Sequence, residues 1–120
     1  MTPDQIAEAH DTVLQRAHDL INGPRPADYS HPLDDFSVTA DFWTTWGHSR
    51  GLLKEDQAYS PEDVAMMMNL MKISRESRKH LLDNVFDGPG YVGCLGRCIA
   101  ERIRRGWGKP YEALKRKWWS

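Results

Sequence analysis

The chain has 120 residues, of which 40% are hydrophobic and 28% charged, and its formal net charge is −1. These values are typical of one globular domain with a single core. The sequence lacks a cysteine zinc site, because Cys94 and Cys98 are the only cysteines and do not form a CxxC pair. A membrane span is also excluded, because the longest apolar-rich run, VAMMMNLMKI, is too short.

The N-terminal half of the sequence predicts two helices separated by a loop. The first is capped by Thr2, has a proline at its first position, and ends at Gly23-Pro24. Residues 23–34 hold three prolines and are expected to form a loop. The second helix is predicted from about Asp34 to Gly47, with an apolar stripe on one face. This stripe consists of Phe36, Ala40, Trp43 and Trp46.

The clearest helix start in the sequence is Ser60-Pro61-Glu62-Asp63, which supplies a cap hydroxyl, a proline and two acids. The helix that follows, through about Lys79, is apolar on several faces, so we expect it to be central and the most buried.

The C-terminal part predicts a break near Asp83 and a helix breaker at Gly88-Pro89-Gly90, followed by a helix that Gly106 and Gly108 end. Gly90, Gly93 and Gly96 recur at helical spacing and should let another backbone approach. A last short helix is predicted from Pro110. The expected fold is all-α: a compact, oligomeric bundle of four to five helices in one domain, 1–120, with a core of 1–105 and a basic, Trp-rich arm of 106–120.

The charge is unevenly distributed along the chain. From Arg97 to the end there are eight Lys or Arg and two Glu, a net charge of +6, which leaves −7 on the first 96 residues. An acidic body with a basic arm indicates self-association, or a polyanionic ligand held by the arm. The N-terminus has no basic start followed by an apolar stretch, so a cytoplasmic location is expected.

Asp83 and Asp87 lie four residues apart and share one face if their segment is helical. Two carboxylates at this spacing suit a hard divalent ion such as Mg²⁺, which also bridges to phosphates. In the structural alternative, Asp83 caps a helix and Asp87 neutralises Lys72 or Arg75. That basic pair needs anions, and ligand phosphates are the other candidates.

Three blocks in order resemble a family of small phage-encoded helical proteins of unassigned function. They are Tyr29-Ser-His31, the PEDVA helix with its Lys72-x-x-Arg75 step, and Asp83-Asn84…Asp87…Gly90-Tyr91. The resemblance covers roughly residues 28 to 92. More distantly, the family is similar to the all-α nucleoside triphosphate pyrophosphohydrolases of the MazG type, which bind Mg²⁺ through clustered carboxylates on neighbouring helices.

The resemblance implies an Mg²⁺-dependent enzyme that releases pyrophosphate from nucleotides. Four acids would be catalytic: Glu62, Asp63, Asp83 and Asp87. Of these, Glu62, Asp83 and Asp87 would also be metal ligands. Six residues would bind the nucleotide: Tyr29, His31, Lys72, Arg75, Asn84 and Tyr91.

Two other functions stay open. A non-enzymatic protein could sequester a nucleotide or cyclic nucleotide defence signal, or bind a host protein, and the tryptophans of the arm favour such an interface: Trp107, Trp118 and Trp119. Nucleic-acid binding through RIRRGWGKPYEALKRKWW ranks last, because the acidic body would repel a long polyanion. In each case a homo-oligomer is expected.

Overall fold

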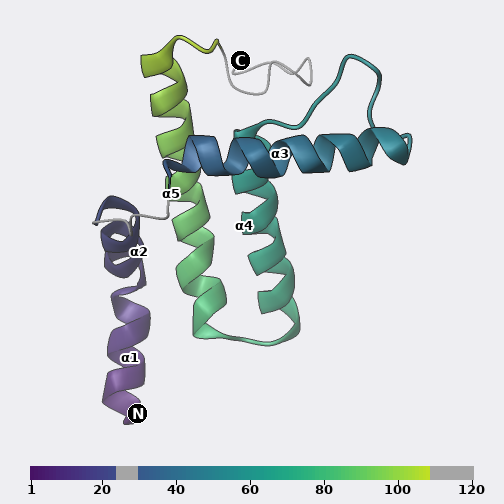
Figure 1. Ribbon diagram of the computed structural model, residues 1–120. Helices are drawn as coiled ribbons and strands as arrows, with labels where there is room; N and C mark the ends of the chain where they lie inside the picture. The colour runs from purple at the N-terminus through teal and green to yellow at the C-terminus, as the bar shows by residue number, and fades with distance from the viewer. Residues whose placement is uncertain (24–29, 109–120) are drawn as a thin grey trace, which may run out of the picture.

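The computed structural model describes residues 1–23 and 30–108, and within these ranges it contains helices and no strand. The helices are α1 (Pro3–Asp11), α2 (Val13–Asn22), α3 (Pro32–Ser49), α4 (Pro61–Arg78) and α5 (Leu82–Arg105). The predicted all-α fold is therefore confirmed. In Figure 1, α4 and α5 form an antiparallel hairpin and α3 crosses it near the start of α4. α2 packs alongside α5, and α1 extends past the turn of the hairpin. None of these described helices is long and apolar enough to span a bilayer.

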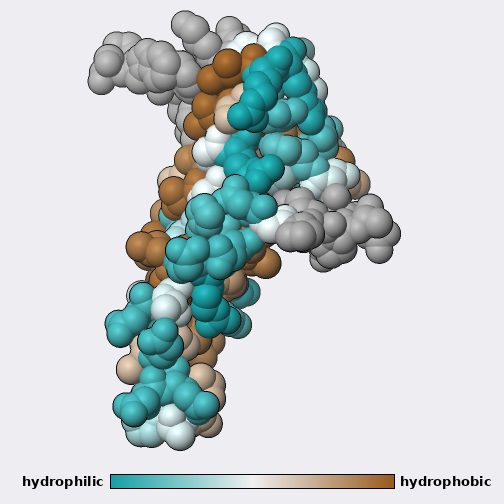
Figure 2. All heavy atoms as spheres, turned by 90° about the vertical axis from the view of Figure 1, so that its left-hand side faces the viewer, coloured by the Kyte–Doolittle hydropathy of each residue, from teal (hydrophilic) through white to brown (hydrophobic). Residues whose placement is uncertain are grey.

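The segment predicted as one N-terminal helix is divided into two at Thr12. The Thr12 hydroxyl donates a hydrogen bond to the Glu8 carbonyl at 2.8 Å, and its backbone lies at φ −103° and ψ 13°. Such side-chain bonding to the preceding turn competes with the helical backbone and bends it. After this bend, α2 buries Val13 and Ala17, whereas α1 buries no residue. Figure 2 shows that the outer surface of α1 and α2 is mostly hydrophilic.

α3 begins two residues earlier than predicted. The backbone N–H of Leu33 donates to His31 Nδ1 at 3.0 Å, so the imidazole caps the helix in front of Pro32. Leu33, Ala40 and Gly47 form the buried face. The inclusion of Trp46 in the inner stripe is wrong, because its side chain is largely exposed.

α4 starts as predicted but is buried only at its start. Ser60 and Asp63 form a reciprocal capping box, and the buried stretch runs from Pro61 to Ala65. Further along the helix, Met67, Leu70 and Ile73 are exposed. α4 has five buried residues, more than any other described helix, so the expectation that it is the most buried one is confirmed, but its burial is confined to the first turns because α3 and α5 cover the rest only partly.

α5 runs unbroken through Gly88-Pro89-Gly90, so the predicted interruption is wrong. Gly88 is buried, and a Cβ there would lie 3.2 Å from Asn69 Oδ1 of α4. A Cβ at Gly93 would meet the Ile21 side chain of α2, whereas Gly90 and Gly96 face open space. A side chain rather than a backbone approaches Gly93, so the predicted approach of another backbone is wrong for all three glycines.

The end of α5 is confirmed at Gly106, which has a φ of 70°. The helix predicted from Pro110 and most of the basic arm lie outside the described residues.

Candidate functional site: the polar seam between α4 and α5

The face that α4 turns toward α5 carries polar side chains at helical spacing, and we call this contact the polar seam. On α4 it consists of Glu62, Asn69, Lys72 and Glu76, and on α5 of Asn84, Asp87, Gly88 and Arg102. Because the two helices are antiparallel, the start of α4 meets the end of α5. The seam contains four of the residues that the sequence singled out.

Glu62 is fully buried and is held by the guanidinium group of Arg102. Arg102 Nε donates to Glu62 Oε1 at 2.5 Å and Nη2 donates to Oε2 at 3.0 Å, and the Arg102 side chain is only 12% exposed. This two-point geometry is the strongest form of carboxylate pairing. The carboxylate of Glu62 is therefore committed to a structural ion pair.

In the middle of the seam, Lys72 Nζ lies 2.9 Å from Asp87 Oδ2. The sequence left two candidate anions for Lys72, an aspartate and a ligand phosphate, and in the structure Lys72 pairs with the aspartate, Asp87. Glu62 precedes Lys72 by ten residues on the same helix, so it stands about 15 Å from Asp87 along the axis. Asp83 lies in the first turn of α5 and is exposed, where its charge favours the positive helix end.

At the turn between the two helices, Glu76 organises three groups. Its Oε1 accepts from Leu81 N–H at 3.0 Å and from Asn84 Nδ2 at 3.2 Å, and its Oε2 lies 2.5 Å from His80 Nδ1. The hydrogen bond from His80, followed by that from Leu81, lowers the pKa of the Glu76 carboxyl group. Asn84 is therefore a buried structural donor at this end of the hairpin.

Asp63 and His31 both cap helices. Ser60 N–H donates to Asp63 Oδ2 at 2.9 Å, and Asp63 N–H donates to Ser60 Oγ at 3.2 Å. His31 caps α3, and burial is the main cause that lowers its pKa, while Glu101 acts in the opposite direction. Capping accounts for both residues without a ligand.

The remaining candidate residues do not lie in the polar seam. Arg75 is exposed on α4, Tyr91 is half-buried on α5, and Tyr29 lies outside the described residues. Across residues 1–23 and 30–108, no group of three or more His, Cys, Asp or Glu side chains is placed to hold a metal ion. The four proposed catalytic acids are thus not brought together.

The buried thiol of Cys98 leads to a prediction about reactivity. Burial, and then the nearby Glu62 carboxylate, raises the pKa of this thiol to about 12, so little thiolate forms at neutral pH. We expect a disulfide reagent at pH 8 to modify Cys98 about a hundredfold more slowly in the native protein than in denaturant. Peptide mass spectrometry of timed samples separates Cys98 from Cys94, and equal rates in the two states would contradict the burial of Cys98.

The fold and the seam define a class of protein: an all-helical domain whose central hairpin is held by one buried and one partly exposed ion pair. A profile for a domain of unknown function (DUF6378) matches residues 12–99, and the chain belongs to this family. The match begins between α1 and α2, so α1 lies outside it.

Two relatives are encoded by mycobacteriophages. The Gene 55 protein of Mycobacterium phage L5 is 37% identical over 86 residues, which are 70% of this chain and 50% of that protein. The Gene 55 protein of Mycobacterium phage D29 is 32% identical over 109 residues, 90% of this chain and 62% of that protein. The chain therefore spans less than two thirds of the length of these relatives. No solved structure matches it.

These relatives confirm the expected relationship to phage-encoded proteins, while the distant similarity to MazG-type enzymes stays a prediction. Sequence reasoning missed Arg102, which it counted only as part of the C-terminal positive charge. Its partner lies 40 residues away, so no local motif marks the pair. A usable signal exists in the hairpin itself: Glu76 with Asn84 and Lys72 with Asp87 lie symmetrically about the turn near His80.

Proposed function

We propose that this member of a phage protein family is a non-catalytic binding module that works as a homodimer joined through the outer face of α3. One observation carries the proposal. Val38, Phe42 and Trp46, which we call the outer ridge, expose 57%, 72% and 60% of their surface. They recur every four residues on the side of α3 away from its buried face. A contiguous apolar patch with two aromatic rings is typical of a protein interface.

The magnesium-dependent hydrolase has weaker support. It needs several carboxylates around one phosphate-sized site, and Glu62 and Asp87 are each engaged by a basic side chain of the seam. Freeing Glu62 from Arg102 would leave a buried charge unpaired, which is strongly unfavourable. A binding function makes no such demand.

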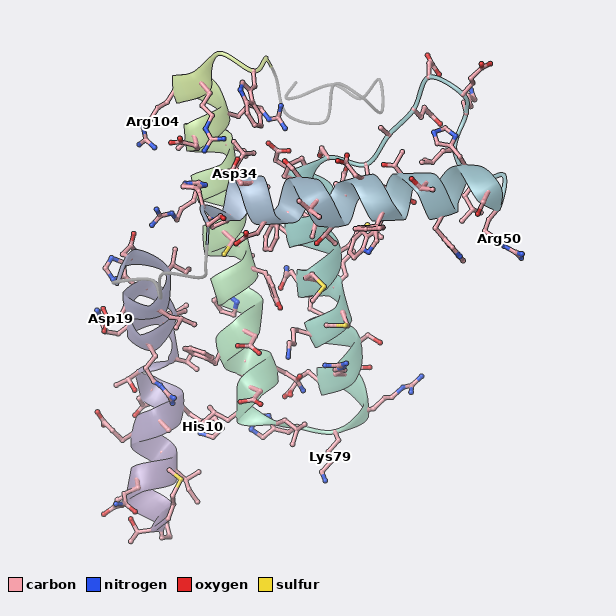
Figure 3. All side chains as sticks on the ribbon, viewed as in Figure 1. His10, Asp19, Asp34, Arg50, Lys79 and Arg104 are labelled. Carbon is pink, nitrogen blue, oxygen red and sulfur yellow. The ribbon has the colours of Figure 1, made fainter. Side chains whose placement is uncertain are left out.

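A second copy of the chain fits the outer ridge best. Asp35 stands at the start of α3 and Arg50 at its end. The neighbouring Asp34 is held by Arg105 through two hydrogen bonds, and Figure 3 shows Asp34 and Arg50 at opposite ends of the helix. If two copies pair antiparallel about Phe42, Val38 of each meets Trp46 of the other, and Asp35 of each approaches Arg50 of the other. In this symmetric arrangement the same apolar patch of each copy meets that of the other, and opposite charges come together at both ends.

The mass of the protein in solution tests this proposal. Light scattering at increasing concentration should give twice the mass of the chain. Replacing both rings, Phe42→Ser and Trp46→Ser, should shift the protein to a monomer, because central aromatic residues each contribute about 2 kcal/mol or more to such interfaces. Arg50→Asp should weaken the dimer through repulsion between like charges. Leu20→Ser is the matched control, since Leu20 of α2 is 65% exposed but lies off the ridge.

A wild-type mass equal to one chain would reject the homodimer. A monomer that captures a purified host protein, and loses it in the ridge variant but not in Leu20→Ser, would assign the ridge to a host partner instead. Release of pyrophosphate from nucleoside triphosphates with Mg²⁺, abolished by Asp87→Asn, would reject the non-catalytic function.

A further inference from the structure

Two histidines that are 70 residues apart in the sequence meet between α1 and the turn that joins α4 to α5. His10 Nε2 lies 2.9 Å from His80 Nε2, and the ring centroids are 5.1 Å apart. Figure 3 shows His10 on α1 beside this turn. The contact therefore connects α1, which buries no residue, to the central hairpin.

The other nitrogen of each ring faces a group that accepts hydrogen bonds. His10 Nδ1 lies 2.7 Å from the Ile6 carbonyl oxygen, and His80 Nδ1 lies 2.5 Å from Glu76 Oε2. A carbonyl oxygen and an ionised carboxylate only accept, so each Nδ1 carries a proton. In two neutral rings, both Nε2 atoms then present lone pairs to each other at 2.9 Å, so the contact needs either a proton carried by one Nε2 or a metal ion between the two.

We propose that His10 and His80 form a site for a divalent transition-metal ion such as Zn²⁺, bound by the two Nε2 atoms and completed by water. Zinc takes neutral imidazole nitrogens at 2.0 to 2.1 Å, which in a tetrahedral site sets the two nitrogens about 3.3 Å apart. The two nitrogens need to separate by about 0.4 Å, and the rings must also tilt so that both lone pairs point to an ion beside the line between the nitrogens. Neither side chain is fully buried, so water can reach the ion.

The hydrogen bonds to Nδ1 support this assignment. Histidines that bind metals usually donate their other ring N–H to a carboxylate or a backbone carbonyl, which fixes the tautomer and the ring orientation. Here His80 has the carboxylate of Glu76 and His10 has the carbonyl of Ile6. The described residues place no third protein ligand at the ion, so a site with two protein ligands is expected.

Calorimetric titration of the metal-free chain with ZnCl₂ tests the proposal. We expect one strong equivalent per chain, with affinity at least tenfold weaker in His10→Gln and in His80→Gln. Glu76→Gln should also weaken binding by about tenfold or more, since it replaces the carboxylate beside His80 Nδ1 by a neutral amide. His18→Gln is the matched control, because His18 lies on α2 beside Asp19 and away from the site.

A second measurement follows the position of α1. Zn²⁺ should slow hydrogen exchange of the α1 amides in the wild-type protein and in His18→Gln, but not in His80→Gln. Absence of zinc binding would overturn the proposal. So would binding of equal strength in both histidine variants, which would assign the ion to other ligands such as the thiols. Loss of α1 protection on raising the pH, with no effect of zinc, would identify a shared proton as the cation instead.

Discussion

Arg102→Met should lower the free energy of unfolding by about 3 to 5 kcal/mol. Glu62 is fully enclosed, and Arg102 supplies both hydrogen bonds to its carboxylate. Removing the guanidinium group would leave this carboxylate buried without its counter-charge, and such a state costs far more than an intact pair contributes. Urea denaturation monitored by circular dichroism measures the change.

Two further variants isolate the cause. Glu62→Leu combined with Arg102→Met replaces the pair by apolar groups and should recover most of the lost stability, because neither charge is then buried alone. Arg104→Met is the surface control: this side chain is exposed and lies 3.4 Å from Glu101, so its loss should cost less than about 1 kcal/mol. If Arg102→Met and Arg104→Met lower the free energy of unfolding equally, the buried Glu62 carboxylate does not depend on Arg102.

Pro89→Ala is expected to raise the free energy of unfolding by about 2 to 3 kcal/mol. Pro89 lies well inside α5, where it cannot donate the helical hydrogen bond to the Val85 carbonyl and its ring crowds that group. Alanine restores the donor and is the best helix former. Thermal and urea unfolding of the two proteins measure the gain.

Pro3→Ala provides the matched control for this substitution. Pro3 is exposed at the first position of α1, where no helical hydrogen bond is lost, so its replacement should have little effect. Gly96→Ala, which enters open space, should add about 1 kcal/mol. A loss of stability in Pro89→Ala would mean that packing of the proline ring outweighs the missing hydrogen bond.

The parts of the fold that the sequence predicted well are those with local causes. Thr2-Pro3 and Ser60-Pro61 each place a hydroxyl cap before a proline, and helices start at both. Gly106 adopts a positive φ and ends α5. These signals depend on a few adjacent residues, so they survive in any tertiary context.

The errors came from tertiary packing. Gly88-Pro89-Gly90 was interpreted as a helix breaker, yet α5 continues because Gly88 packs against Asn69 and the helix is supported by α2 and α4. Trp46 was assigned to the inner face of α3 on spacing alone, although the four residues of α3 that are buried are all smaller. Helical periodicity identifies apolar faces but does not say which of them is covered.

The candidate site was predicted in part. Lys72 and Asp87 were recognised as possible partners, and they are paired. The grouping of Glu62 with Asp83 and Asp87 depended on the relative direction of two helices, which short motifs do not encode. An antiparallel hairpin with its turn near His80 places Glu62 at the far end from both aspartates, facing Arg102.

The polar seam has a consequence for how this protein can change over evolutionary time. Two helices joined by methionines can slide past each other by a turn and still bury similar surface. Here a displacement of about 5.4 Å, one helical turn, would separate the buried Glu62 carboxylate from Arg102 and leave its charge without a partner or water. A substitution at one residue of a charged pair is therefore tolerated only together with a substitution at the other. The paired positions of α4 and α5 should covary among homologues.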